Sequence, residues 1–119
     1  MVEINFDKLD RTLVLAELSC NHLQSFDIAV RTIEAMKKAG ADVVKVQNDN
    51  PDGGITIDCD NEYFQIGGGT LWDGKTLNKL YKETYTPWEW LPKLQKVAHD
   101  LDMEFFSAPS DLELIFWKR

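Results

Sequence analysis

Two apolar segments on either side of one amphipathic segment constrain the fold of this chain more than any other feature. Residues 11–18 (RTLVLAEL) and residues 41–47 (ADVVKVQ) are short, apolar and rich in branched side chains, as buried strands are. Between them, residues 25–40 begin with Ser25 as a helix N-cap, repeat apolar residues at helical spacing, and end on two lysines and Gly40. A strand, a helix and a strand with short links form a βαβ unit, so the sequence predicts a parallel sheet.

The middle of the chain predicts a long loop and then two helices. Residues 48–74 are dominated by turn residues and glycines, and loops of this length are commonly functional. Apolar residues at helical spacing resume within residues 77–84. In residues 86–89 (TPWE), Thr86 fits an N-cap, with proline at the first helical position and Glu89 completing a capping box. This pattern predicts the start of a second helix there.

The end of the chain predicts one more strand. Residues 103–110 (MEFFSAPS) resemble a third buried strand, and residues 110–113 (SDLE) predict the capping box of a further helix. Residues 1–119 are therefore expected to form one α/β domain with a parallel sheet.

Composition excludes several classes of function. The 119 residues carry a net charge of -7 without clustered lysine or arginine, which argues against a nucleic-acid-binding protein. The first residues lack both a basic start and a long apolar core, so we expect neither a signal peptide nor a membrane span. Cys20 and Cys59 are far apart in sequence, which suggests neither a disulfide framework nor a zinc site and favours a reducing, cytoplasmic location.

A lysine in the middle of an apolar strand is the strongest indication of a functional site. Lys45 shares one strand face with Gln47, and Glu17 lies near the end of the neighbouring strand. We interpret Lys45 as a cation for a phosphate or carboxylate, with Gln47 hydrogen-bonding beside it and Glu17 handling a proton or hydroxyl. A purely structural ion pair between Glu17 and Lys45 is the alternative.

Three further polar residues lie near the predicted strand ends. Asn21 and His22 follow the first strand, where a lone histidine is more often a hydrogen-bonded structural residue than a metal ligand. Ser107 lies at the end of the third strand and is a candidate donor to an anion. It is equally a candidate cap for the following turn.

Several motifs together resemble one enzyme family. They are AELSCNH, AGADVVKVQ, TID, GGTLWDGKTL, LYKETYTPWEW and FFSAPSD, in this order, and they extend from about Leu15 to Asp111. In sequence and spacing they resemble the N-terminal part of the sialic acid synthase family. Within that family, the aromatic stretch around residues 81–90 is more similar to pseudaminic acid synthases than to N-acetylneuraminate synthases.

The resemblance implies a (β/α)8 barrel that condenses phosphoenolpyruvate with the open-chain form of an N-acetylated amino sugar, giving a nonulosonic acid and phosphate. It implies a divalent metal, Mn²⁺ or Mg²⁺, that polarises the sugar aldehyde. By matching position, Lys45 would bind the phosphoenolpyruvate anion, with Gln47 assisting and Glu17 contacting the substrates. Asn21 and His22 would shape the same rim, and the enzyme would be a homodimer.

The chain also departs from the family pattern. Ala108 replaces a residue with a hydroxyl group that the family usually has near the phosphate, and Gln24 replaces a common glycine. The resemblance places the metal-binding histidines, further phosphate ligands and a C-terminal antifreeze-like domain beyond Arg119. We therefore expect an N-terminal barrel fragment of three β/α units that is inactive and of low stability alone. The alternative is a small α/β module that binds anionic metabolites or pairs with a second chain.

Overall fold

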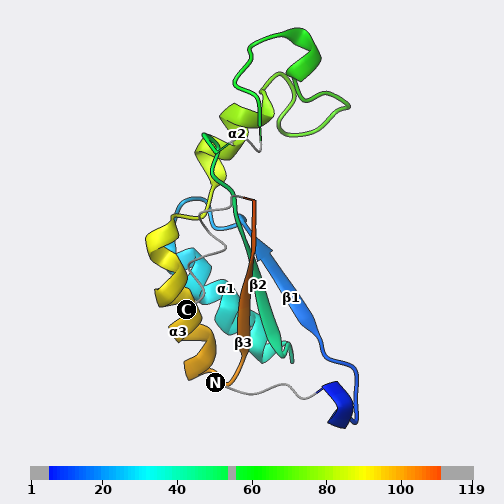
Figure 1. Cartoon of the computed structure of the whole chain (residues 1–119), viewed down its shortest axis with the longest axis vertical. Helices are drawn as coiled ribbons and strands as arrows, with labels where there is room; N and C mark the ends of the chain where they lie inside the picture. The colour runs from blue at the N-terminus through cyan, green and yellow to red at the C-terminus, as the bar shows by residue number, and fades with distance from the viewer. Residues whose placement is uncertain (1–5, 54–55, 111–119) are drawn as a thin grey trace.

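The computed structural model describes residues 6–53 and 56–110 and contains a three-stranded parallel sheet (Figure 1). Its strands are β1 (Leu15–Ser19), β2 (Val43–Asn48) and β3 (Glu104–Pro109), in the order β1-β2-β3. Both strand pairs are parallel. The predicted α/β fold with three parallel strands is therefore confirmed.

Helices α1 (Phe26–Lys38) and α3 (Leu91–Asp100) pack against one face of this sheet (Figure 1). Helix α1 begins as the sequence predicts, since Oγ of Ser25 accepts a hydrogen bond from the backbone N–H of Ile28 at 3.4 Å. It ends on Lys37 and Lys38, where positive charge interacts favourably with the helix dipole.

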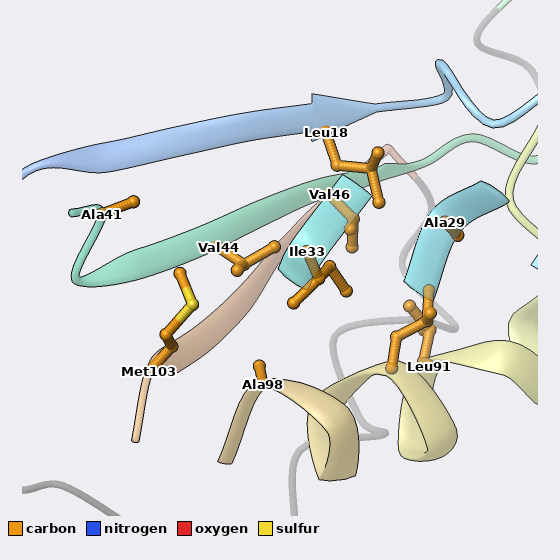
Figure 2. Packing of buried hydrophobic residues seen from close by; sticks show 10 residues of the cluster. Leu18, Ala29, Ile33, Ala41, Val44, Val46, Leu91, Ala98 and Met103 are labelled. Carbon is orange, nitrogen blue, oxygen red and sulfur yellow. The ribbon is translucent and has the colours of Figure 1, made fainter. Parts of the chain in front are cut away.

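The hydrophobic core lies between the helices and β2 (Figure 2). Alternate side chains of β2 point toward the helices. Two of them, Val44 and Val46, have no exposed surface. The helices contribute small or branched side chains that fit closely against a sheet. The core residues are Leu18, Ala29, Ile33, Ala41, Val44, Val46, Leu91, Leu94, Ala98 and Met103.

The expectation that all three strands are buried was wrong for β1 and β3. Leu15 is 46% exposed, and within β1 only Leu18 is buried. Most of β3 is half-buried, and Pro109 is exposed. The reason is that α1 and α3 cover one face only, and among the described residues β1 and β3 are the edges of the sheet.

Residues 56–84, which we call the arm, project beyond the carboxyl ends of the strands (Figure 1). The arm contains a 3₁₀ turn (Glu62–Phe64), one antiparallel bridge between Gln65 and Thr76, and helix α2 (Leu77–Thr84), which confirms the predicted helix there. The Cα radius of gyration is 16.3 Å, against about 13.5 Å for a compact domain of this length. The predicted loop therefore forms an extended structure above the sheet.

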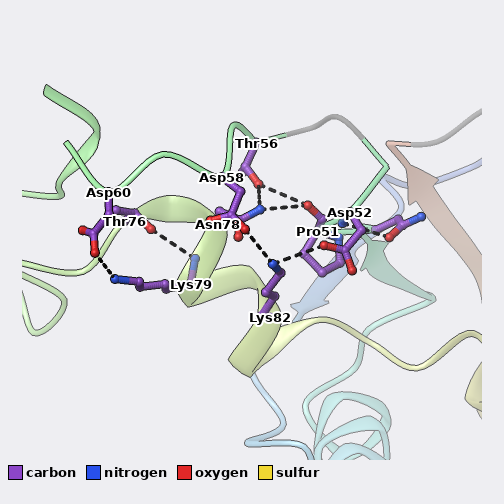
Figure 3. A network of polar contacts seen from close by, with 10 residues as sticks. Pro51, Asp52, Thr56, Asp58, Asp60, Thr76, Asn78, Lys79 and Lys82 are labelled. Atoms are coloured by element: carbon purple, nitrogen blue, oxygen red, sulfur yellow. Dashed lines mark hydrogen bonds and ion pairs between the residues drawn. The ribbon is translucent and has the colours of Figure 1, made fainter.

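Polar contacts fix the arm to the segment after β2 (Figure 3). Nδ2 of Asn78 donates to the carbonyl of Pro51 and to Oγ1 of Thr56, both at 3.0 Å. Nζ of Lys82 also lies 3.2 Å from the carboxylate of Asp52, whereas Lys79 pairs with Asp60 inside the arm at 2.7 Å. Because the described arm has few buried apolar residues, these polar contacts set its position on the molecule.

The capping box predicted at Thr86 was wrong. A 3₁₀ turn (Trp88–Trp90) precedes α3, and neither element has a side-chain cap in the described structure. Thr86 is fully buried, and its hydroxyl contacts other side chains instead. A first 3₁₀ turn spans Phe6–Lys8, and the helix predicted after residue 110 lies outside the described residues.

Asp42 joins the amino-terminal ends of all three strands. Its carboxylate accepts two hydrogen bonds from Arg11 and one from the Val14 N–H at 2.9 Å, and its carbonyl accepts the Glu104 N–H. The Arg11 guanidinium, followed by the Val14 N–H, lowers the pKa of Asp42 to about 2 from an ordinary value of 3.8.

This pKa shift predicts how stability depends on pH. A carboxyl group with a lowered folded-state pKa stabilises the fold above 3.8, and that contribution disappears as the pH falls toward 2. Asp42→Asn is therefore expected to lower the thermal midpoint at pH 7, and the difference from the original chain should shrink below pH 3. Asp27→Asn, which removes an exposed helical ion pair, is the control and should change little. An Asp42→Asn effect that is constant from pH 7 to pH 2 would contradict this assignment.

Candidate functional site

Glu17 and Lys45 lie opposite each other on neighbouring parallel strands. They are register partners between β1 and β2, and Oε2 of Glu17 lies 2.6 Å from Nζ of Lys45. Oε1 of Glu17 accepts the backbone N–H of Ser19 at 3.1 Å and its hydroxyl at 3.0 Å. The predicted proximity of Glu17 and Lys45 is confirmed. Their side chains are 36% and 30% exposed, so the pair is accessible from solvent.

The pair lies on the sheet face that α1 and α3 leave uncovered. Val44 and Val46 point into the core, so by strand alternation Lys45 and Gln47 point to the other face. Both are half-buried, and Gln47 is two residues nearer the carboxyl end. Glu17, Lys45 and Gln47 therefore form one polar surface, which we call the carboxyl-edge cluster.

Ser107 does not join this cluster. It is in register with Val46, on the helix side of β3, and its hydroxyl donates to Oδ1 of Asn48. Strand β3 also continues beyond Ser107 to Pro109. The structure thus separates Ser107 from Lys45, although both lie toward the same end of the sheet.

Asn48 is a structural residue that the sequence reasoning did not identify. It is fully buried at the end of β2, where its Nδ2 donates to the carbonyl of Thr86 at 3.5 Å. Its own carbonyl accepts the N–H and the hydroxyl of Ser110, each at 3.2 Å. The signal was available, because Asn48 continues the buried alternation of Val44 and Val46 with a polar side chain.

His22 is completely buried, and both of its ring nitrogens have partners. Nδ1 accepts the backbone N–H of Gln24 at 3.2 Å, so the ring proton belongs on Nε2, which lies 3.0 Å from the Thr86 hydroxyl oxygen. Burial lowers the pKa of His22 and favours this neutral form. The ring also packs edge-on against Trp90 at 5.2 Å. His22 is thus a hydrogen-bonded residue with no exposed surface, although the resemblance places it at the rim of the substrate site.

The same hydrogen bonds continue toward the carboxyl-edge cluster. Because Nε2 of His22 donates to Thr86, the Thr86 hydroxyl donates to Sγ of Cys20 at 3.8 Å. The Cys20 thiol in turn contacts the carbonyl of Gln47 at 3.6 Å, and burial raises the pKa of this thiol. Cys20 and Cys59 are both free, as the sequence suggested. This series of hydrogen bonds fixes the backbone of Gln47. Asn21, by contrast, is exposed at the rim.

The hydrogen bonds from His22 through Thr86 to Cys20 predict the effect of a substitution at Thr86. Thr86→Val leaves the N–H of buried His22 without an acceptor, so we expect it to lower the free energy of unfolding by about 1–3 kcal/mol. Thr86→Ser keeps the hydroxyl and should recover most of the loss. The control is Thr84→Val, whose hydroxyl bonds only a carbonyl of its own helix. Urea unfolding measures the free energy of unfolding of all three variants. Equal losses for Thr86→Val and Thr84→Val would contradict the hydrogen-bond series through Thr86.

The described residues contain neither a cluster of metal ligands nor a membrane-spanning helix. No group of three His, Cys, Asp or Glu side chains within residues 6–53 and 56–110 is arranged to hold a metal ion. The resemblance places the ligands of its divalent metal beyond Arg119, outside these ranges. No helix in the same ranges is both long and apolar enough to cross a bilayer.

Comparison with known proteins identifies close relatives in sequence. Residues 32–117 match the model of the NeuB family. The chain is 40% identical over 114 residues to the pseudaminic acid synthase of Campylobacter jejuni subsp. jejuni serotype O:23/36 (strain 81-176), covering 93% of this chain and 33% of that protein. It is 41% identical over 96 residues to the pseudaminic acid synthase of Helicobacter pylori (strain ATCC 700392 / 26695), covering 81% and 28% respectively.

A solved structure shares the arrangement of the chain. The spore coat polysaccharide biosynthesis protein SpsE of Bacillus subtilis superposes with a TM-score of 0.53 and 25% sequence identity. The match covers 85% of this chain and 24% of SpsE. The chain therefore spans about a third or less of the length of the proteins that it matches.

Proposed function

The chain belongs to the NeuB family, and on that premise we propose that it forms the first three β/α units of a (β/α)8 barrel synthase. The proposed reaction is the condensation of phosphoenolpyruvate with an N-acetylated amino sugar to give a nonulosonic acid. The relatives named pseudaminic acid synthase favour that branch of the family. Barrel enzymes have their active sites at the carboxyl ends of the strands, and Gln47 of the carboxyl-edge cluster is the next-to-last residue of β2.

One observation carries this proposal: an accessible lysine ammonium on the helix-free face of the central strand. Lys45 lies between β1 and β3 at a point where a barrel interior would be. Its partner Glu17 is partly exposed, and exposed ion pairs contribute only about 0.2–1 kcal/mol. A ligand with two or three negative charges would therefore displace the Glu17 carboxylate from Lys45 at low cost.

The remaining residues of the cluster have roles that follow from their chemistry. Lys45 would donate to the phosphate or carboxylate of phosphoenolpyruvate, and the Gln47 amide would hydrogen-bond beside it. The carboxylate of Glu17, released from Lys45, would accept a proton or a sugar hydroxyl. Asn21 would contact substrate from the rim, and His22 would act indirectly by holding Thr86 and the Gln47 backbone in place.

The proposed complete enzyme would include residues that this chain does not supply. Residues that bind the divalent metal would come from the rest of the barrel, since the described residues do not supply them. The complete enzyme would be a cytoplasmic homodimer. Ser107 would reach an anion only after its hydroxyl leaves Asn48, so it is the weakest member of the proposed binding set.

A mixing experiment tests the proposed function. The chain is combined with a separately produced polypeptide that covers the remaining part of a pseudaminic acid synthase. Phosphate release is then followed with phosphoenolpyruvate, an N-acetylated amino sugar and Mn²⁺. We expect turnover in the mixture and none with either polypeptide alone. A stable, monomeric chain that never supports turnover would favour the alternative, a small anion-binding module.

A further inference from the structure

A concave site lies beside the end of β2 and is chemically different from the carboxyl-edge cluster. A cavity of about 490 Å³ opens between the segment after β2 and the segment that follows the arm. This volume falls in the range of small-molecule sites. Its chemically informative lining residues are Asp49, Asp52, Lys82, Tyr85, Trp88 and Glu89.

Asp49 is the unusual member of this lining. Its side chain belongs to a residue that is only 3% exposed, and within the described ranges its carboxylate has no hydrogen bond or ion pair. A buried carboxylate without a partner is costly, so such groups normally have a cation or a donor against them. Asp49 lines the cavity, so a cationic ligand there would meet its carboxylate.

The one lysine in the lining does not serve as that partner. Nζ of Lys82 lies 3.2 Å from a carboxylate oxygen of Asp52 and of Asp58. Dashed lines mark both ion pairs in Figure 3. Hydrogen bonds to these two carboxylates raise the pKa of Lys82, so it stays charged and committed to them. Asp49 and Glu89 thus leave the cavity with an excess of negative charge.

The negative charge is also evident at neighbouring side chains. Burial raises the pKa of the Tyr81 hydroxyl, and the charge of Asp49 raises it further. Asp49 acts in the same direction on the pKa of Cys20, where burial and a hydrogen-bond contribution from Thr86 precede it in size. Both effects are those of a nearby negative charge.

We propose that this cavity binds a small organic cation, with a primary ammonium group paired to Asp49 and its apolar part against Tyr85 and Trp88. Aromatic side chains attract cations, and a primary ammonium has three donors for carboxylate oxygens. A metal ion fits less well, because the described residues hold no cluster with a metal-ligand arrangement.

A titration of the ¹⁵N-labelled chain with n-butylammonium chloride tests this site by NMR. We expect saturable shifts of the Asp49 amide and the Trp88 indole N–H, and binding about tenfold or more tighter than that of n-butanol, its uncharged analogue. Asp49→Asn and Glu89→Gln should each weaken ammonium binding, the first by about tenfold or more. Asp60→Asn, which breaks an arm ion pair away from the cavity, is the matched control and should bind normally.

The outcomes against the proposal are equally clear. Equal binding of n-butanol, unchanged binding by Asp49→Asn, or a preference for Mg²⁺ over the ammonium would overturn it. A chain that gives no dispersed spectrum, or no saturable shift, would overturn it as well, because the cavity requires a fixed structure. The titration contains no phosphoenolpyruvate and does not involve Lys45, so its result is independent of the proposed synthase function.

Discussion

Lys45→Ala in the reconstituted mixture is expected to lower kcat/KM for phosphoenolpyruvate by about 100-fold or more. Removing one partner from a desolvated, hydrogen-bonded charge pair typically costs about 2–5 kcal/mol, and about 3 kcal/mol corresponds to this factor. The loss should exceed that expected for a surface lysine because the complete barrel would enclose Lys45. Phosphate release at varied phosphoenolpyruvate concentration measures the effect.

Two variants separate the role of Lys45 from a general loss of positive charge. Lys79→Ala removes an ammonium that pairs with Asp60 in the arm, and it should leave kcat/KM unchanged. Lys45→Arg keeps the charge but changes the donor geometry, so it should retain part of the activity. If Lys45→Ala behaves like Lys79→Ala, the interpretation of the Glu17–Lys45 pair as purely structural is correct.

Leu94→Ala is expected to lower the free energy of unfolding of the chain by about 2–5 kcal/mol. Leu94 has no exposed surface and packs in the cluster shared by α1, α3 and the sheet. The substitution removes buried methyl groups and leaves a cavity that the surrounding core fills only in part. Because the chain alone is expected to be less stable than the about 5–15 kcal/mol of ordinary domains, this loss would unfold a substantial fraction of it.

Leu71→Ala is the matched control, since Leu71 is 96% exposed on the arm. It should change the free energy of unfolding by less than about 0.5 kcal/mol. Urea unfolding followed by circular dichroism measures both variants. Equal effects would contradict the core assignment. A steep, cooperative transition of the original chain, normal for its length, would contradict the expected low stability of this part alone.

The sequence was sufficient for features that depend on local pattern. Ser25 and the terminal lysines predicted α1 nearly to its ends, because caps and dipole effects act within one helical turn. The alternation in β2 predicted that Lys45 and Gln47 share a face, and adjacency of parallel strands brought Glu17 to Lys45. These relations require only the backbone period and the order of the strands.

Features that depend on tertiary contacts could not be predicted in the same way. Thr86 has the sequence of an N-cap, but its hydroxyl is used by His22, a residue far away in the chain. Asn48 and Ser107 meet because β2 and β3 pair in one particular register. The exposure of Leu15 reflects which face the helices cover, and an apolar pattern alone does not specify that.

Site-specific acetylation of lysines, measured by mass spectrometry on the reconstituted mixture, tests the central claim most directly. Lys45 and Lys79 each pair with one carboxylate, at 2.6 Å and 2.7 Å, and the acetylation rate of each lysine is compared with its own rate without phosphoenolpyruvate. If Lys45 binds the anion, phosphoenolpyruvate should slow acetylation of Lys45 by about tenfold or more at saturation and leave Lys79 unchanged. Equal acetylation of Lys45 with and without phosphoenolpyruvate would contradict the claim that the carboxyl-edge cluster binds this substrate.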